Sequence, residues 1–413
     1  MDTKFKDYEA IYGGVCAVCG FEAAGIHCGI RLNRSKKDLA LIYSKTPSVA
    51  AAVYTKNKVK GAPIYVTQDH LKKSDFKVNA VIVNSGNANT CNADGIEKAS
   101  AMCELAAEQL NIDKEKVIVA STGVIGETLP IEPIKSHVKE LCDKLSSSGS
   151  HDAANAIMTT DTREKEYAIE FNLGGKTCHL GIIGKGTGMI NPNMGTMLCF
   201  ITCDVAISQS LLQKALRYVT DRTFNMISID GDTSTNDMVV IMTNETSGND
   251  KIESEGDDYN TFVSALYVVM RRISRELAAD GEGATKLIEC KVKHAPSEKT
   301  AQNIAKSVIS SMLLKAAIYG EDANWGRILC AIGYAEGDFD VSKISVQLAS
   351  RTKDVMVCKN GMGVDFSEEA AQFILNGDEI KIIVDLHNGS FTAMSWGCDL
   401  THDYVKINGE YRT

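Results

Sequence analysis

Hydrophobic residues in the first third of the chain alternate between short apolar runs and stretches with helical spacing. The run KVNAVIVNSGNANT (77–90) predicts a buried strand that ends in a Gly/Asn loop. DGIEKASAMCELAAEQLN (94–111) predicts a helix with Asp94 near its start. KEKVIVASTG (114–123) predicts a second strand that runs into a Thr-Gly turn. The first two segments therefore form a strand, loop and helix unit.

The remainder of the chain continues the mixture of strand and helix patterns. Strands are predicted at EYAIEFNL (166–173) and KTCHLGIIG (176–184) around a Gly174-Gly175 hairpin, and then at MLCFITCDV (197–205), KISVQLA (343–349), EIKIIVDL (379–386) and SFTAMSWGC (390–398). A long amphipathic helix is predicted over 257–283 and a second helix over SEKTAQNIAKSVISSMLLKAA (297–317). The fold class is α/β or α+β with much sheet.

Length and composition are those of a globular enzyme. The chain has 413 residues, which is too many for one ordinary core, so we expect two large lobes or two halves with a broad interface. Hydrophobic residues make up 44%, and there are only 6 prolines, which leaves no long disordered tract. The net charge of -9, with both signs interspersed, argues against nucleic-acid binding. Small molecules are the expected partners.

The lack of a recognisable targeting or membrane segment, together with the cysteine usage, predicts a soluble, cytoplasmic protein. No apolar run follows the N-terminal lysines, and no stretch approaches the roughly 20 apolar residues of a membrane span. The 13 cysteines are an odd number and lie singly in predicted core segments, for example Cys103, Cys142, Cys199, Cys203 and Cys330. A reducing compartment fits this pattern best.

One cysteine cluster has two interpretations. Cys16 and Cys19 form a CxxC, and with His27 and Cys28 they could supply four zinc ligands. The second pair is adjacent in sequence, whereas zinc motifs space such ligands two to five residues apart. Two thiols beside a turn glycine explain the pattern equally simply, so we predict no metal site.

Three segments combine glycine with Thr or Asn: NSGNAN (84–89), STGVIG (121–126) and KGTGMINPNMGT (185–196). Each could be an ordinary turn. None matches the Walker pattern or the full dinucleotide fingerprint with its distal acidic residue, so we predict no nucleotide site and no cofactor.

The third segment resembles a known self-cleavage motif. KGTGMINPNMGTML is similar to the sequence at which the glutamate N-acetyltransferase, or ornithine acetyltransferase, family breaks its own chain before a threonine. The resemblance covers essentially the whole chain and includes NSGNAN (84–89), STGVIG (121–126), MTTDT (158–162), DGDTSTND (230–237), DGEGATK (280–286), DANWGR (322–327) and KINGEYRT (406–413).

The resemblance implies an architecture and a reaction. It implies a layered helix/sheet sandwich made of two chains, 1–195 and 196–413, that assemble as an α2β2 heterotetramer. It implies transfer of an acetyl group from N-acetylornithine to glutamate in arginine biosynthesis. Some family members also accept acetyl-CoA as donor, and no residue of this sequence decides that point.

A threonine that follows a strained peptide bond can break that bond with its own hydroxyl. Attack of the Thr196 hydroxyl on the Gly195 carbonyl gives an ester by an N-to-O shift, which water then splits. The new α-amino group, with a reference pKa of about 7.7 to 8.0, can act as base for its own hydroxyl. The family usually has alanine where this chain has Gly195. The greater conformational freedom of glycine could relax the strain, which puts the rate of cleavage in question.

The resemblance also implies residue roles. Thr122 and Gly123 correspond to the oxyanion hole, although a plain strand-ending turn is the simpler alternative for those two residues alone. Substrate binding is carried over onto Thr159, Lys185, Thr196, Glu282, Asn408 and Thr413. A cationic Lys185 suits a substrate carboxylate, and an anionic Glu282 suits a substrate ammonium group. The alternative is that both are ordinary surface charges, because most lysines and glutamates are exposed.

Two other functions use the same scaffold. A self-cleaved amidase or aminopeptidase would pass the acyl group to water in place of glutamate. An uncut chain would act as a binding protein for acetylated amino acids. Consumption of N-acetylornithine without glutamate distinguishes the first alternative, and tight ligand binding without turnover distinguishes the second.

Overall fold

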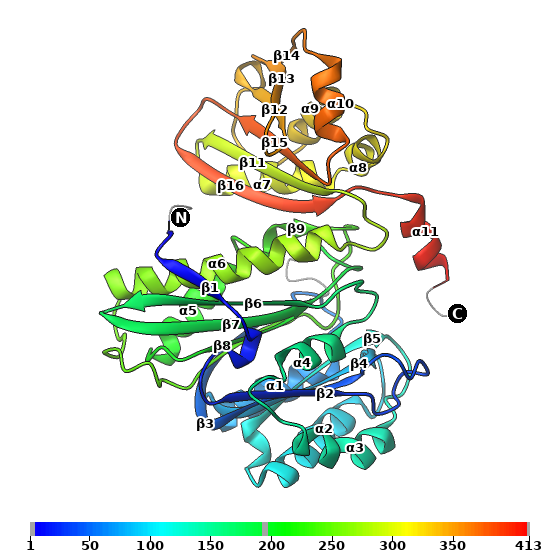
Figure 1. The fold of residues 1–413 in the computed structure, drawn as a ribbon. Coiled ribbons are helices and arrows are strands. Elements are labelled where there is room, and N and C mark those ends of the chain that lie inside the picture. Colours follow the sequence, from blue (N-terminus) through cyan, green and yellow to red (C-terminus); the bar gives the residue numbers. More distant parts are fainter. Residues whose placement is uncertain (1–4, 192–196, 411–413) are drawn as a thin grey trace. The chain divides into compact units, whose positions relative to one another are not determined.

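The computed structural model describes residues 5–191 and 197–410, which form two compact units (Figure 1). The first unit consists of Met1–Gly186, Asn193–Thr220 and Thr233–Ile273. The second unit consists of Thr187–Pro192, Asp221–Asp232 and Ser274–Thr413. Each unit carries its own sheet, and together they confirm the mixed α/β class.

The sheet of the first unit is mostly antiparallel. Its strands lie in the spatial order β1 (Tyr8–Ile11), β6 (Lys165–Leu173), β7 (Lys176–Lys185), β8 (Leu198–Cys203), β10 (Met238–Thr243), β3 (Leu39–Tyr54), β4 (Lys77–Asn87) and β5 (Val117–Val124), and β2 (Phe21–Ile26) also pairs with β3. The β4–β5 and β8–β10 pairs are parallel. Parallel neighbours need a crossover, and for β4 and β5 it is helix α2 (Gly95–Leu110).

Strand β3 links two parts of this sheet. Its first half pairs with β2 and β4, and its second half pairs with β10. The register against β4 shifts between Tyr43 and Ser48, where the ladder is irregular. Such an irregularity bends a strand, so one long strand can serve two groups of partners.

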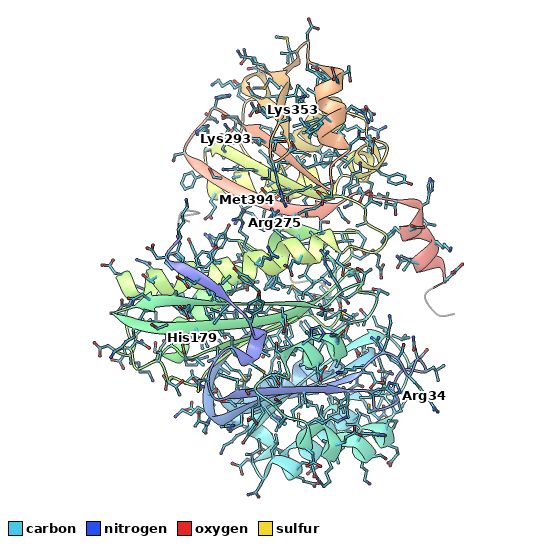
Figure 2. All side chains as sticks on the ribbon, viewed as in Figure 1. Arg34, His179, Arg275, Lys293, Lys353 and Met394 are labelled. Atoms are coloured by element: carbon cyan, nitrogen blue, oxygen red, sulfur yellow. The ribbon has the colours of Figure 1, made fainter. Side chains whose placement is uncertain are left out.

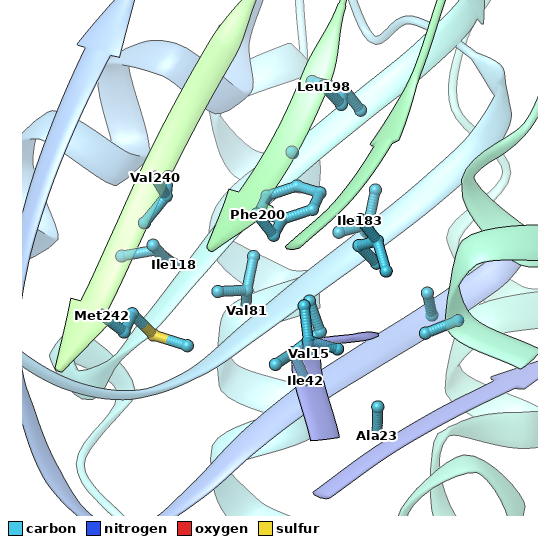
Figure 3. Packing of buried hydrophobic residues seen from close by; sticks show 14 of the residues in the cluster. Val15, Ala23, Ile42, Val81, Ile118, Ile183, Leu198, Phe200, Val240 and Met242 are labelled. Carbon is cyan, nitrogen blue, oxygen red and sulfur yellow. The ribbon is translucent and has the colours of Figure 1, made fainter. Parts of the chain in front are cut away.

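Two cores cover opposite faces of the β2–β5 strands. On one face Leu41 and Ile82 pack with α2 and α3 (Ile131–Asp143). On the other face Ile42 and Val81 join α4 (Ser150–Ile157) and strands β7, β8 and β10. Figure 3 shows this second cluster, with Ile183, Phe200 and Val240 among the labelled side chains. Burial on both faces explains why β4 reads as a continuous apolar run.

The other helices of the first unit also pack on the sheet. Helix α1 (Ala62–Lys73) contacts β5, and α5 (Gln209–Thr220) holds β3 through Gln213, whose side-chain amide donates to Ala52 O over 3.0 Å. Helix α6 (Asp257–Ala279) is the predicted long helix, and it continues from the first unit into the second.

Residues before and after the predicted cleavage point interleave in the first sheet. Strands β8 and β10 come after Thr196, yet β8 pairs with β7 and β10 pairs with β3, both of which precede it. The division into 1–195 and 196–413 remains a prediction. If the chain is cut there, the β8–β10 pair of the second product stays hydrogen-bonded to β7 on one side and to β3 on the other.

The second unit contains a smaller sheet and five shorter helices within the described residues. Its strands lie in the order β14 (Met362–Gly363), β13 (Asp354–Lys359), β12 (Ser345–Ala349), β15 (Glu379–Asp385), β11 (Leu287–Ala295), β16 (Phe391–Cys398) and β9 (Ile227–Ser228). Its helices are α7 (Glu298–Ser310), α8 (Met312–Tyr319), α9 (Trp325–Gly333), α10 (Glu368–Leu375) and α11 (His402–Gly409).

The single helix predicted over 297–317 is wrong. Helix α7 ends at Ser310, and Ser311 adopts an extended conformation with its hydroxyl accepting from Leu314 N–H. A serine oxygen in this position caps the first turn of a new helix. The helix therefore breaks at Ser311, although the apolar residues keep their helical spacing across the break. All 13 cysteines are unpaired thiols; Cys103, Cys199 and Cys203 are buried as predicted, whereas Cys142 is only half-buried and Cys330 is exposed. None of the described helices is long and apolar enough to cross a membrane.

Candidate functional site

Thr122 and Gly123 lie near the end of β5, paired with the end of β4. Gly123 has φ 133° and pairs with Gly86. A Cβ at Gly123 would lie 2.3 Å from the carbonyl carbon of Gly86, so no larger residue fits. The NSGNAN and STGVIG loops are therefore held together at their glycines, which the separate turn patterns did not indicate.

Lys185 is the cation of this site. It ends β7, its side chain is fully buried, and its Nζ donates to Thr122 Oγ1 over 3.2 Å and to Thr159 Oγ1 over 2.8 Å. An ammonium group can only donate, so both threonine oxygens act as acceptors here. The Thr122 hydroxyl hydrogen must then point away from Lys185. The surface-charge alternative for Lys185 is wrong.

Asp161 provides the negative charge beside these residues. Its Oδ1 accepts from Lys165 Nζ over 2.8 Å and from Gly186 N–H over 3.0 Å, and its Oδ2 accepts from Thr159 N–H over 3.0 Å. Burial acts to raise the pKa of Asp161, but Lys185, Lys165 and these donors outweigh it and hold the pKa at about 2. Asp161 is thus ionised and fixes Thr159 next to Lys185.

Asn236 joins a third loop to the first two. Its buried side-chain nitrogen donates to Ala88 O over 2.6 Å and to Ser121 O over 3.0 Å. Its oxygen accepts from Thr90 Oγ1 over 2.6 Å. The DGDTSTND segment therefore fixes the ends of β4 and β5 relative to each other, directly beside Thr122.

The second unit contains the acidic candidate. Asn408 Nδ2 donates to Glu282 Oε2 over 2.8 Å, and Glu282 N–H donates to Thr187 O over 2.9 Å. A Cβ at Gly188 would lie 2.4 Å from Glu282 Oε2, so the glycine of the cleavage motif lets this carboxylate pack directly against the main chain. Glu282 is 7% exposed, which excludes an ordinary surface charge. Glu282 and Asn408, 126 residues apart, are thus brought together.

Asp230, also in the second unit, fixes the middle of the cleavage motif. It accepts from Met189 N–H over 2.6 Å and from Ile190 N–H over 2.9 Å. Gly195, Thr196 and Thr413, three of the predicted site residues, lie outside the described residues.

Cys16, Cys19, His27 and Cys28 do not form a cluster of ligand atoms; within residues 5–191 and 197–410 such a cluster is formed by His294, Asp385 and His387. Asp385 is already paired with Lys293 and His294 in the second unit (Figure 2 labels Lys293). The sequence did not single out this cluster, whose members come from different strands and loops.

Comparison with known proteins identifies the family. The model of the ArgJ family matches residues 22–413. The chain belongs to the ArgJ family. It is 49% identical over 394 residues to "Arginine biosynthesis bifunctional protein ArgJ 1" of Clostridium acetobutylicum, covering 95% of this chain and 96% of the relative.

A second relative and a solved structure are also similar to the chain. The chain is 46% identical to "Arginine biosynthesis bifunctional protein ArgJ" of Bacillus subtilis, covering 98% of this chain and 97% of the relative. A crystal structure of the ArgJ protein from Bacillus halodurans is 44% identical, covers 51% of this chain and 97% of the crystallised chain, and has a TM-score of 0.48. The resemblance inferred from the cleavage motif is confirmed.

Proposed function

We propose that this ArgJ family member cleaves its chain between Gly195 and Thr196 and then transfers acetyl groups from N-acetylornithine to glutamate through Thr196. The observation that carries the proposal is the fully buried Lys185, which donates to the Thr122 hydroxyl beside the close approach of Gly123 to Gly86. Support also comes from relatives that are named arginine biosynthesis bifunctional proteins.

Cleavage begins with attack of Thr196 Oγ on the Gly195 carbonyl carbon. The C–N bond breaks, the threonine nitrogen takes up the hydroxyl proton, and an ester links Gly195 to Thr196 Oγ. Water then hydrolyses the ester, which leaves a Gly195 carboxylate and a free amino group on Thr196. Because β8 pairs with β7 and β10 pairs with β3, we expect both products to stay associated. The α2β2 assembly belongs to the same proposal.

In the transfer reaction the Thr196 amino group removes the proton from its own hydroxyl. Oγ attacks the acetyl carbonyl of N-acetylornithine, and the ornithine amine leaves with that proton. The glutamate amine next attacks the acetyl-Thr196 ester and gives up a proton to the Thr196 amino group. The bond between the acetyl carbon and Thr196 Oγ then breaks, Oγ takes up that proton, and N-acetylglutamate leaves. Both tetrahedral intermediates carry an oxyanion, which is stabilised in this proposal by the Thr122 hydroxyl and the Gly123 N–H.

Lys185 has two proposed roles in this reaction. Since Lys185 donates to Thr122 Oγ1, it turns the hydroxyl hydrogen outward and makes it a stronger donor for an oxyanion. Its charge also suits a substrate carboxylate. Glu282 with Asn408 offers a negative charge and a donor for a substrate ammonium group. Thr159, Thr196 and Thr413 complete the proposed substrate contacts.

The word bifunctional in the relatives' names favours acetyl-CoA as a second acetyl donor, bound as a substrate and not as a resident cofactor. Both donors would form the same acetyl-Thr196 ester. Glutamate then takes up the acetyl group in either case.

The reaction is tested with N-acetylornithine that carries a deuterated acetyl group. We expect the label to appear in N-acetylglutamate, with one ornithine released per label transferred, and the same experiment with labelled acetyl-CoA tests the second donor. A parallel incubation without glutamate is the control. Labelled acetate formed at the same rate in that control would instead support an amidase, and no release of ornithine in either would contradict the transferase.

A further inference from the structure

Asp237 is a buried carboxyl group that the mechanism above does not use. It is the last residue of DGDTSTND and directly precedes β10, and its side chain is 0% exposed. Its main chain is fixed on both sides, because Asp237 O accepts from Thr55 N–H over 3.1 Å and Met238 N–H donates to Met197 O over 3.1 Å. The main chain that carries the Asp237 side chain is therefore fixed in position.

The side chain contacts the residue that follows the proposed nucleophile. Asp237 Oδ1 accepts from Met197 N–H over 2.9 Å. This N–H belongs to the peptide bond that joins Met197 to Thr196. Asp237 Oδ2 is buried and has no hydrogen-bond partner among the described residues. A buried polar oxygen without a partner is costly, so such a group in a native fold calls for an explanation.

The protonation state of Asp237 follows from its surroundings. Burial raises the pKa of Asp237 well above its ordinary value, and the opposing effects of the Met197 N–H, the Thr55 side chain and the Lys185 charge are smaller. Burial thus favours the protonated carboxyl group, which has one oxygen as acceptor and an O–H as donor. A neutral acid also avoids the larger cost of a buried ion.

We propose that Asp237 is a positioning residue for Thr196: its carboxyl group accepts from Met197 N–H and so holds the peptide bond that joins Thr196 to Met197. The proposal rests on the proposed self-cleavage. It assigns the DGDTSTND segment two tasks, since Asn236 fixes the Thr122 loop and Asp237 fixes the nucleophile's peptide.

Positioning matters because the hydroxyl must reach a carbonyl carbon at a short distance and a fixed angle. A displacement of about 1 Å can lower the rate of such a step about 100-fold. Met197 leads into β8, which is held between β7 and β10, so Asp237 adds the restraint at the residue next to Thr196. The same restraint acts in cleavage and in acetyl transfer.

The experiment compares three variants with the wild type: Asp237→Ala, Asp237→Asn and Asp204→Ala. Asparagine keeps an acceptor and replaces the O–H donor by an N–H donor without adding charge. Asp204 is the matched control, because it is a buried carboxylate directly after β8, at the strand's other end, where it accepts from His179 (labelled in Figure 2). Cleavage is followed by intact mass during cell-free synthesis, and kcat and KM are measured on cleaved protein.

We expect Asp237→Ala to slow cleavage and lower kcat about 100-fold each, with KM for N-acetylornithine nearly unchanged. Asp237→Asn should restore both rates to within about threefold of the wild type, with the same pH profile of kcat. Asp204→Ala should destabilise the protein without slowing cleavage of its folded fraction.

Three results would overturn the proposal: an Asp237→Ala protein that is cleaved at the wild-type rate, an Asp237→Asn protein as slow as Asp237→Ala, or an altered pH profile in Asp237→Asn. The last two remain decisive where Asp237→Ala does not fold. An uncut wild type would instead remove the proposed function itself, so the two failures can be told apart.

Discussion

Two clusters of buried charge, one in each unit, use their cations differently. In the first unit, the Lys185 cluster consists of Lys185, Asp161, Lys165, Thr122 and Thr159. In the second unit, the Arg275 cluster consists of Arg275, Glu289, Glu379 and Trp396 (Figure 2 labels Arg275). Both clusters remove charges from water, which is favourable only with close partners.

The Arg275 cluster directs its donors to carboxylates. Arg275 pairs with Glu289 and, over 2.8 Å, with Glu379, and Trp396 Nε1 donates to Glu289 over 2.9 Å. The Lys185 cluster directs its Nζ to two neutral hydroxyl oxygens, while Asp161 accepts from Lys165 and the main chain. The first arrangement stabilises strands β11 and β15. The second leaves a polarised threonine hydroxyl, which is what an acyl-transfer site needs.

The largest expected difference comes from removing each cation. Lys185→Met and Arg275→Met should both lower the free energy of unfolding by about 3 kcal/mol, because each removes a positive charge that balances nearby carboxylates. Only Lys185→Met should also lower kcat per folded molecule, by about 1000-fold. Urea unfolding and turnover of both variants measure this. Equal loss of kcat in Arg275→Met would remove the distinction between the clusters.

Removal of the Thr122 hydroxyl separates its proposed role in catalysis from its role in stability. Thr122→Ala should lower kcat about 100- to 1000-fold, the usual effect of losing one oxyanion donor. The free energy of unfolding should fall by only about 1 kcal/mol, the net value of one hydrogen bond. Thr122→Ser keeps the hydroxyl and is the control, with kcat expected near the wild-type value. A Thr122→Ala enzyme with normal kcat would assign the turn a purely structural role.

Low pH should remove the stability that ionised Asp161 contributes to the Lys185 cluster. The pKa of Asp161, about 2, lies below its unfolded value, so its contribution is fully present above about pH 4 and is lost as pH falls toward 2. The loss should be about 2 kcal/mol. Stability curves of the wild type and Asp161→Asn should therefore converge between pH 4 and 2. Parallel curves over that range would contradict the assignment.

Lys306, a half-buried lysine of the second unit, extends the comparison to high pH. Burial lowers the pKa of Lys306 to about 7, and its Nζ donates to Asn225 O over 2.7 Å. Between pH 7 and its unfolded value, the unfolded chain binds more protons at this lysine, so stability rises with pH. Relative to Lys306→Met, the wild type should gain about 1 kcal/mol per pH unit between pH 8 and 10. Thermal unfolding across that range measures the difference.

Local patterns predicted most of the elements that position the site. Alternation and Gly/Asn turns predicted β4, β5 and the β6–β7 hairpin, and helical spacing predicted α2 and α6. These features depend on neighbours in sequence. The break at Ser311 was missed because a capping hydrogen bond does not alter the apolar spacing.

The site itself was only partly predictable. The family resemblance pointed to Thr122, Gly123 and Lys185, but the contact between Lys185 and Thr122 joins residues 63 apart in sequence. Asp161 and Asn236 were inside the quoted segments MTTDT and DGDTSTND, yet no local pattern indicates that one neutralises Lys185 and the other ties two loops together. Such roles depend on the sheet topology.

The central claim is that Thr196 becomes the N-terminal nucleophile, and the denatured mass spectrum of the wild type beside Thr196→Ala tests it most directly. We predict two fragments that meet at Gly195 and Thr196 in the wild type, and one intact chain without transferase activity in the variant. A single intact mass in both proteins, or full activity in Thr196→Ala, would contradict the account.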